Sequence, residues 1–181
     1  MKKYIALLRG INVGGNNKIS MQQLKETFRQ AGYTDAQTYI NSGNIIFSSN
    51  DSEEALQRVC ETLISEQFGL AIAVAIISAE ELTDALEHAP EWWNIPNGAK
   101  HNAIFVIQPA TAEDVCAEVG EIKPEYERVA YYGRVIFWSA PMETFSRTRW
   151  SKVSGTKTYQ KITVRNANTA SKLAELAAAA Q

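Results

Sequence analysis

The first 78 residues alternate between apolar runs and amphipathic stretches, which predicts the element order β-α-β-β-α-β. Apolar or alternating runs predict strands at residues 4–8, 36–40, 44–48 and 71–77. Apolar residues at helical spacing predict helices after Ser20 and after Ser52, each opened by a capping pattern and ended by a glycine. This order is the split βαβ arrangement of ferredoxin-like domains, whose sheet is antiparallel.

The second half of the chain repeats this order of patterns with little shared sequence. Strands are expected at 102–108, 128–132, 135–139 and 161–164, with the middle two forming a hairpin across Gly133-Arg134. Helices are expected at 111–121 and 143–154, and Asn168 is expected to cap a final helix.

The two halves are separated by an irregular region, residues 79–101. It opens with a short linking helix and continues with two prolines and the adjacent Trp92 and Trp93. The sequence therefore predicts an α+β fold with two tandem ferredoxin-like subdomains, residues 1–78 and 102–181, joined by 79–101 and completed by a C-terminal helix.

Polar residues are concentrated where the predicted strands end. Residues 9–18 combine three glycines, three asparagines, an arginine and a lysine, and residues 41–44 form a second Asn/Gly turn. Glycine lets a ligand approach the main chain, and asparagine supplies both donors and acceptors. The first and third strands of a ferredoxin-like sheet are antiparallel neighbours, so we expect the two loops to share one edge.

A third polar element, residues 163–169, precedes the predicted final helix. Helix N-termini favour anions, and Arg165 can hold phosphate or carboxylate through two hydrogen bonds. The expected ligand is small and anionic, phosphate- or nucleotide-like. The expected ligand-binding residues are Arg9, Asn12, Gly14, Gly15, Asn17, Lys18, Asn41, Ser42, Asn44, Arg165 and Asn166. A structural role remains open, because Gly/Asn segments also make tight turns.

Charge distribution and composition bear on the cellular location and on the kinds of site that the chain can form. Residues 1–25 carry five cations and no acid, residues 144–181 carry seven cations and one acid, and the other acids lie between them. No apolar run has the length of a membrane span, and the N-terminus does not follow the pattern of a secretion signal, which favours a cytoplasmic protein. Two cysteines cannot supply a disulfide framework or a four-ligand zinc site; Cys60 and Cys116 are interpreted as packing residues, and no metal or cofactor is indicated.

Two other classes of function stay open. A single-stranded nucleic-acid-binding module is an alternative because residues 145–165 interleave aromatic residues with cations, although the acidic middle of the chain opposes it. An enzyme is also open, yet no nucleophile or general base can be identified. Ser42 lacks the setting of a nucleophile elbow, and nothing in the sequence pairs His88 or His101 with a serine or cysteine. Oligomeric state is not readable from the sequence.

Three segments resemble a known family. They are Leu7-Leu8-Arg9-Gly10-Ile11-Asn12-Val13-Gly14-Gly15 with Asn17-Lys18, Thr38-Tyr39 before Asn41-Ser42-Gly43-Asn44, and Thr163-x-Arg165-Asn166-x-x-Thr169. On these motifs the chain resembles the bacterial Domain of Unknown Function 1697 family, although members usually carry an aromatic where this chain has Ala167. The resemblance implies an α+β protein with a duplicated ferredoxin-like arrangement, and it implies no activity.

Overall fold

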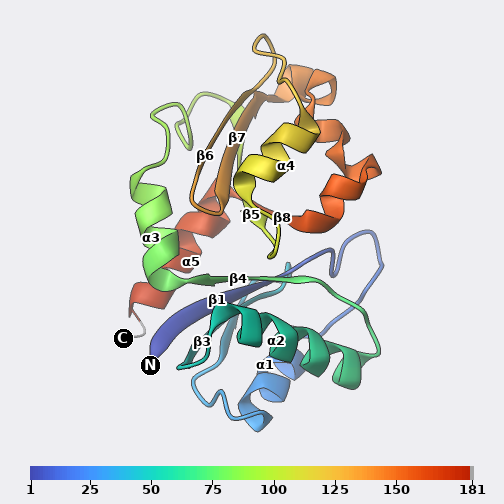
Figure 1. Ribbon diagram of the computed structural model, residues 1–181, viewed down its shortest axis with the longest axis vertical. Coiled ribbons are helices and arrows are strands. Elements are labelled where there is room, and N and C mark those ends of the chain that lie inside the picture. Colours follow the sequence, from blue (N-terminus) through green and yellow to red (C-terminus); the bar gives the residue numbers. More distant parts are fainter. Residues whose placement is uncertain (180–181) are drawn as a thin grey trace. The chain divides into compact units, whose positions relative to one another are not determined.

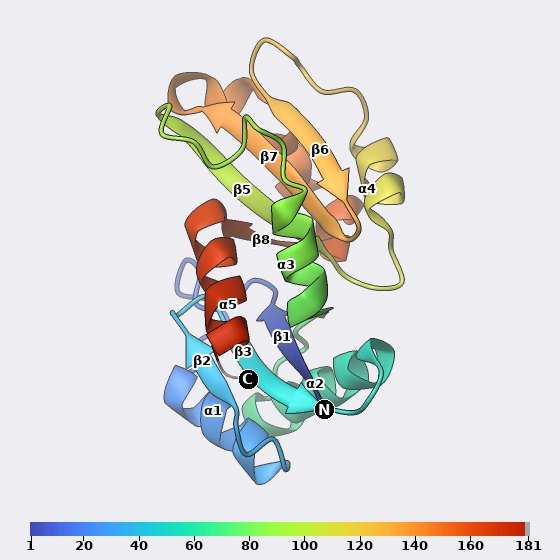
Figure 2. The same cartoon turned by 90° about the vertical axis from the view of Figure 1, so that its left-hand side faces the viewer.

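The computed structural model describes residues 1–179, and the chain divides into two units (Figures 1 and 2). The first unit comprises Met1–Leu82 together with the chain from Leu173 onward, and the second comprises Thr83–Lys172. The fold is mixed, with two four-stranded antiparallel sheets, one in each unit, and a C-terminal helix. Each unit is described by itself.

The first unit is built on a sheet of strand order β2-β3-β1-β4. Its elements are β1 (Lys2–Leu8), α1 (Met21–Gln30), β2 (Gln37–Tyr39), β3 (Asn44–Ser49), α2 (Glu53–Phe68), β4 (Val74–Ser78) and α3 (Ala79–Glu87), which leads into the second unit. β1 pairs antiparallel with both β3 and β4. The antiparallel sheet expected for residues 1–78 is therefore confirmed.

Both main helices of this unit pack on the same core. Leu24 and Phe28 of α1 join Leu56, Cys60 and Ile64 of α2 in one buried apolar cluster with the sheet. Figure 1 shows α1 and α2 on one side of β1 and β3. The predicted caps are confirmed, because Ser20 and Ser52 accept hydrogen bonds from the backbone three residues later and Gly69 ends α2 in a left-handed conformation.

The second unit has the corresponding strand order, β6-β7-β5-β8, which Figure 2 shows from the side. Its elements are β5 (Ala99–Val106), α4 (Ala112–Val119), β6 (Arg128–Tyr132), β7 (Val135–Pro141), three 3₁₀ helices (Met142–Arg147, Trp150–Gly155 and Lys157–Lys161), β8 (Ile162–Asn166) and the start of the C-terminal helix α5 (Ala167–Ala179). The residues of α5 from Leu173 onward belong to the first unit. The core lies between the sheet, α4 and the 3₁₀ segments, with Ile104, Val115, Ile136 and Trp150 buried there.

Three sequence predictions for this unit need correction. β5 begins at Ala99, three residues earlier than expected. The expected helix at 143–154 is replaced by 3₁₀ turns, since Thr148, Ser151 and Thr156 bond to backbone carbonyls three residues earlier instead of continuing an α-helix. The cap of α5 is Asn166, not Asn168, because the Asn166 side-chain oxygen accepts from the backbone N–H of Thr169 at 2.8 Å.

None of the helices among residues 1–179 is both long enough and apolar enough to span a bilayer.

Candidate functional site

The two polar loops of the first unit meet at one edge of its sheet, as the strand pairing predicts. The backbone N–H of Leu8 donates to the carbonyl of Gly43 at 2.9 Å, and the Asn12 side-chain amide donates to the carbonyl of Asn41 at 2.8 Å. A Cβ on Gly43 would lie 2.5 Å from Cδ1 of Ile11, so the second loop packs directly against the first. Together, residues 9–18 and 40–44 are called the paired loops below.

Asparagine side chains hold the paired loops in place. Asn12 donates to the Ile19 carbonyl at 3.0 Å and accepts from the Ile19 N–H at 2.9 Å. Asn17 donates to the Gly10 carbonyl at 3.0 Å, and the fully buried Asn44 donates to the Tyr39 carbonyl at 2.9 Å. These three of the expected ligand-binding residues therefore bond to backbone within the protein.

The backbone of the paired loops adopts unusual conformations. Asn12 and Asn17 have φ values of 54° and 48°, which asparagine tolerates better than most residues. Ile40 has a φ of 48°, although a β-branched residue is disfavoured there and its side chain is 47% exposed. Ile40 directly precedes Asn41, the partner of Asn12, so the strained residue stands where the two loops join.

The cationic and glycine positions of the paired loops face solvent to different degrees. Gly14, Gly15 and Lys18 are exposed, while Arg9 is half-buried and its backbone N–H donates to the Ala73 carbonyl at 3.0 Å. Val13, in the same loop, is 65% exposed. The loop tip therefore presents cations, exposed glycine backbone and one apolar side chain on the same turn.

The remaining expected residues of the second loop lie beside this junction. Asn41 is exposed, and Ser42 is half-buried, with its hydroxyl accepting from the Asn44 amide at 3.0 Å. The Ser42 hydroxyl thus helps to hold the Asn44 side chain within the turn.

The third motif belongs to the second unit. Arg165 is 6% exposed, and its guanidinium donates to the Thr163 hydroxyl and the Val164 carbonyl, each at 2.9 Å. Burial lowers the pKa of Arg165 to about 10, which still leaves it charged at neutral pH. With Asn166 capping α5, this motif has a defined role within its own unit.

A polar constellation that the sequence did not reveal lies in the second unit. The Nδ1 atom of His101 lies 2.5 Å from the Ser139 hydroxyl, and its Nε2 atom lies 2.9 Å from Oδ1 of Asn97 and 3.0 Å from the carbonyl of Ile95. The sequence offered no support for pairing His101 with a serine, and the structure places Ser139 beside it. The sequence contained a signal for one part of this constellation, because the two-residue turn at Gly133-Arg134 places Arg128 opposite Ser139. It contained no signal for the position of His101 opposite Ser139, which depends on the register between β5 and β7.

A cavity of about 400 Å³ borders this constellation. It is lined by Trp92, Ile95, Asn97, Ala99, Pro124, Glu125, Tyr126, Glu127, Arg128, Ser139, Ala140 and Pro141, all in the second unit. Glu127 is buried and its carboxylate accepts from the backbone N–H groups of Arg149 and Trp150. The carboxylate of Glu127 thus serves the backbone of the neighbouring 3₁₀ segment.

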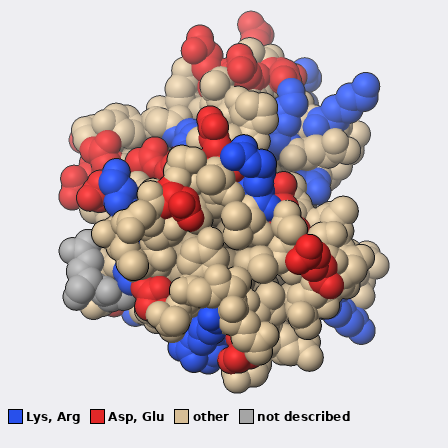
Figure 3. Space-filling view, turned by 60° about the horizontal axis from the view of Figure 1, so that its bottom comes forward, with Lys and Arg blue, Asp and Glu red and all other residues tan. Residues whose placement is uncertain are grey.

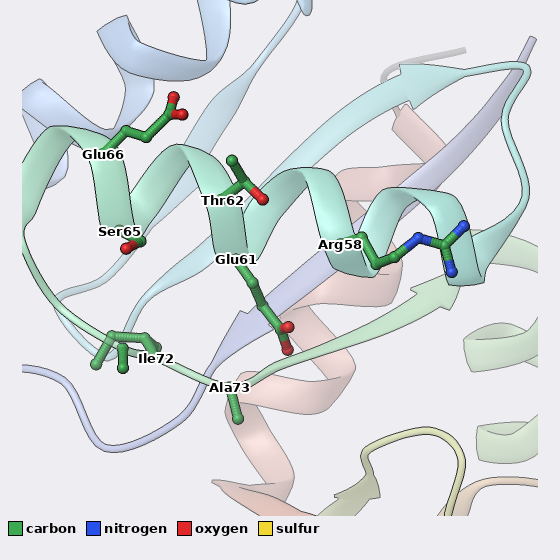
Figure 4. A pocket seen from close by; sticks show the side chains of 8 residues that line it. Arg58, Glu61, Thr62, Ser65, Glu66, Ile72 and Ala73 are labelled. Atoms are coloured by element: carbon green, nitrogen blue, oxygen red, sulfur yellow. The ribbon is translucent and has the colours of Figure 1, made fainter.

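A second hollow, of about 690 Å³, lies along α2 of the first unit (Figure 4). Figure 4 shows Glu61 extending toward the segment that carries Ala73, and the Glu61 carboxylate accepts from the N–H of Val74 at 3.2 Å. Arg58, Thr62, Ser65, Glu66, Ala71 and Ile72 complete the lining. None of the expected ligand-binding residues lines this hollow.

The features expected for nucleic-acid stacking are mostly turned inward. Trp150 is buried in the core of the second unit, and Phe145 and Tyr159 are half-buried against the same core. Figure 3 shows lysine and arginine side chains in small separate groups, with aspartate and glutamate between them, on the face in view. Phe145, Trp150 and Tyr159, the aromatic residues of 145–165, therefore do not form the exposed surface that a stacking platform requires.

Both cysteines are poorly suited to nucleophilic chemistry. Burial raises the pKa of the Cys60 thiol well above its ordinary value, and burial also raises the pKa of the half-buried Cys116. Among residues 1–179, no group of three or more His, Cys, Asp or Glu side chains is arranged to hold a metal ion.

The sheets, their order and the paired loops define a class of α+β proteins with two four-stranded antiparallel sheets and an Asn/Gly-rich junction at one sheet edge. The family described as Protein of unknown function (DUF1697) matches residues 1–137, and the chain belongs to this family. The match includes the paired loops and ends before the third motif. The resemblance drawn from the sequence is therefore confirmed.

Solved structures include a similar chain of nearly the same length. The chain is similar to the conserved bacterial protein SP0830 from Streptococcus pneumoniae, with 30% identity, a TM-score of 0.88, and coverage of 98% of this chain and 99% of that one. None of the curated proteins matches the chain.

Proposed function

We propose that the paired loops of the first unit bind a small anionic ligand of phosphate- or nucleotide-like chemistry. The observation that carries this proposal is the left-handed conformation of Ile40 at the junction of the two loops. A β-branched residue in this conformation costs roughly 1–3 kcal/mol, and such strain persists mainly at functional sites. A loop that served only as a turn would be more stable with asparagine or glycine at this position.

The roles of the expected residues follow from their surroundings. Arg9 and Lys18 supply positive charge, and the exposed backbone of Gly14 and Gly15 supplies N–H donors to an anion. Asn12, Asn17, Asn41 and Asn44 hold the loops in the binding conformation before the ligand arrives, which reduces the entropy lost on binding. Arg165 and Asn166 are assigned to the second unit's own structure.

The same asparagine bonds also support the structural alternative, in which the paired loops only join strands. The binding proposal and the structural alternative give different expectations for the cations. Turn formation needs the asparagines and glycines, whereas anion binding also needs the charges of Arg9 and Lys18. The nucleic-acid alternative retains cations but lacks exposed aromatics between residues 145 and 165, so the structure does not favour it.

A thermal-shift experiment with inorganic phosphate, nucleotides and phosphorylated sugars tests the proposal. A ligand at one hundred times its dissociation constant stabilises the native state by about 2.7 kcal/mol. We expect Arg9→Ala and Lys18→Ala to lose this shift while keeping the melting temperature of the unliganded protein. Lys157→Ala, at an exposed lysine of the second unit, is the matched control and should keep the shift.

A further variant tests whether the left-handed backbone at Ile40 is strained. Ile40→Asn removes the strained β-branched residue and is expected to raise the stability of the unliganded protein by about 1 kcal/mol. If no anion shifts the melting temperature, or if Arg9→Ala and Lys18→Ala melt early without affecting any ligand response, the structural alternative is correct.

We also propose a finer fold class for the two units, the ferredoxin-like arrangement. The shared strand orders β2-β3-β1-β4 and β6-β7-β5-β8 support two tandem ferredoxin-like subdomains, 1–78 and 102–181, with 79–101 between them. The second has 3₁₀ turns in place of its second helix. A cytoplasmic location in a bacterial cell belongs to the same proposal and can be checked by cell fractionation.

A further inference from the structure

We propose that Ser139 and His101 form a nucleophilic pair that hydrolyses small neutral esters in the 400 Å³ cavity of the second unit. This inference does not rest on the proposed anion site, which lies in the other unit. It rests on three observations: a row of residues across the sheet, the hydrogen bonds that fix the histidine tautomer, and the cavity beside the serine.

The row spans three adjacent strands. Ser139 on β7 stands directly opposite His101 on β5 and directly opposite Arg128 on β6. Residues directly opposite one another in antiparallel strands project from the same face, so the three side chains form a line with the hydroxyl in the middle. Backbone pairing thus fixes the spacing of a hydroxyl, an imidazole and a guanidinium without relying on a flexible loop.

The partners of His101 fix which nitrogen carries the proton. The Ile95 carbonyl can only accept, and Oδ1 of Asn97 is identified as the oxygen because it also accepts from the Ala99 N–H at 3.1 Å. Nε2 of a neutral His101 therefore carries the hydrogen and donates to both. Nδ1 is then left with a lone pair facing the Ser139 hydroxyl at 2.5 Å, which is the arrangement a general base needs.

The order of groups matches a known catalytic logic. A base that contacts the nucleophile through one ring nitrogen and is oriented by an asparagine through the other is the arrangement of Cys-His-Asn proteases, which shows that an amide can serve as the orienting group. The backbones of β5 and β7 are already paired with each other and do not require the Ser139–His101 bond. The backbone carbonyls of the paired loops, by contrast, use the asparagine side chains as hydrogen-bond donors.

The cavity provides room for a small substrate. Ser139 is 6% exposed and lines the cavity together with Trp92, Tyr126 and Pro141, which give it apolar and aromatic walls. Arg128 lines the same space on the opposite side of Ser139 from His101. Its guanidinium is therefore positioned to stabilise negative charge that develops on a carbonyl oxygen attacked by Ser139.

The proposed reaction is balanced with water as the second substrate. The Ser139 oxygen forms a bond to the ester carbonyl carbon while its proton passes to Nδ1 of His101. The ester C–O bond then breaks, and the alcohol leaves with that proton. Water attacks the acyl-serine, giving one proton to His101, and the carboxylic acid leaves as the proton returns to Ser139. Asn97 acts as a positioning residue, since its side-chain oxygen bonds to His101 and to the Ala99 N–H and acts on Ser139 only through the histidine.

The test uses a fluorophosphonate probe, which phosphonylates activated serines, together with p-nitrophenyl acetate. We expect the probe to label the intact chain, and mass spectrometry to locate the label on Ser139. His101→Gln keeps a polar side chain but cannot act as the base, and is expected to reduce labelling and ester hydrolysis by roughly 10²–10⁴-fold. His88→Gln changes the other histidine and is expected to leave both unchanged.

Asn97 is tested by a conservative replacement. Asn97→Asp keeps an acceptor for Nε2 and for the Ala99 N–H and should retain labelling, whereas Asn97→Leu removes both bonds and should lose labelling while the chain stays folded at the assay temperature. No label on Ser139 in the wild-type chain, or equal labelling of wild type and His101→Gln, would overturn the proposal and leave His101 as a structural link between β5 and residues 95–97. The first of these outcomes is measured on the wild-type chain alone, so it does not depend on whether any variant folds.

Discussion

The paired loops of the first unit and the His101–Ser139 row of the second place polar groups in opposite ways on sheets of corresponding strand order. In the paired loops, asparagine side chains bond to backbone carbonyls that the turns leave without strand partners. In the row, two side chains bond to each other on the face of a sheet whose backbone is already paired. Asparagine side chains in the loops thus satisfy backbone groups, whereas the Ser139–His101 bond joins two side chains, and His101 reaches a backbone group only through Nε2, at the Ile95 carbonyl.

This difference affects how each region can be interpreted. An Asn/Gly loop has a sufficient structural explanation, so its function must be argued from residues that the turn does not need, namely Arg9, Lys18 and Ile40. Ser139 and His101 bond to each other on a strand face, and His101 bonds to a backbone group only through Nε2, at the Ile95 carbonyl. The Ser139–His101 contact itself satisfies no backbone group, so this contact points more directly to chemistry.

The largest expected effect comes from the close packing of the paired loops. In Gly43→Ala the new Cβ would meet Ile11 at 2.5 Å and Leu8 at 2.9 Å, at a φ of +85°. We expect a loss of roughly 3 kcal/mol in unfolding free energy, from overpacking and from the left-handed backbone together. Gly133→Ala, in the hairpin turn of the second unit, has a φ of +56° and open space, so it should cost only about 1 kcal/mol. Urea denaturation of both variants measures the difference, and equal losses would show that the loops are not tightly packed.

A smaller effect separates two asparagines with different burial. Asn44→Ala removes the fully buried donor to the Tyr39 carbonyl and should lower the unfolding free energy by about 2 kcal/mol. Asn166→Ala in the second unit removes an exposed cap of α5 and should cost about 1 kcal/mol. The comparison is made by thermal melts at neutral pH. A larger loss for Asn166→Ala would contradict the importance assigned to Asn44.

The smallest effect is a pH dependence that should differ between the units. Burial raises the pKa of Asp35, but hydrogen bonds from Lys3 and Ser48 outweigh it and bring the pKa to about 2. Because this lies below the value of about 3.9 in an unfolded chain, Asp35 stabilises the fold above that pH and loses this contribution as the pH falls toward about 2. Asp35→Asn should therefore weaken the acid dependence of the melting temperature in this window.

The second unit contains a matching carboxylate. Hydrogen bonds from Lys161 and Thr158 lower the pKa of Glu118, but this ion pair is more exposed than that of Lys3 and Asp35. Glu118→Gln should accordingly change the acid dependence less than Asp35→Asn does. The reverse order in acid melts would show that the Lys3–Asp35 pair is not the stronger of the two.

Local rules were sufficient for much of the first unit. The caps at Ser20 and Ser52 and the meeting of the paired loops could be predicted because hydroxyl caps act over three residues and antiparallel pairing fixes which strand ends adjoin. The 3₁₀ segments could not, because the apolar spacing of residues 143–154 resembles that of a helix while Thr148 and Ser151 divert the backbone bonds.

The two candidate sites also differ in how far the sequence alone could predict them. Each of the paired loops is visible in the sequence because the residues within it are contiguous. The His101–Ser139 contact joins residues 38 positions apart and depends on the register between two strands that no short turn connects. Asn97 adds a third element from an irregular segment, which no periodic pattern describes.

The division of α5 between the two units has a consequence for the order in which the chain is made. Residues 83–172 form one uninterrupted stretch, whereas the first unit also includes the chain from Leu173 onward. On the ribosome, synthesis proceeds from the N-terminus and domains tend to fold as they emerge. The second unit is therefore complete in sequence before the first, and the last helix must emerge before the first unit has all of its residues.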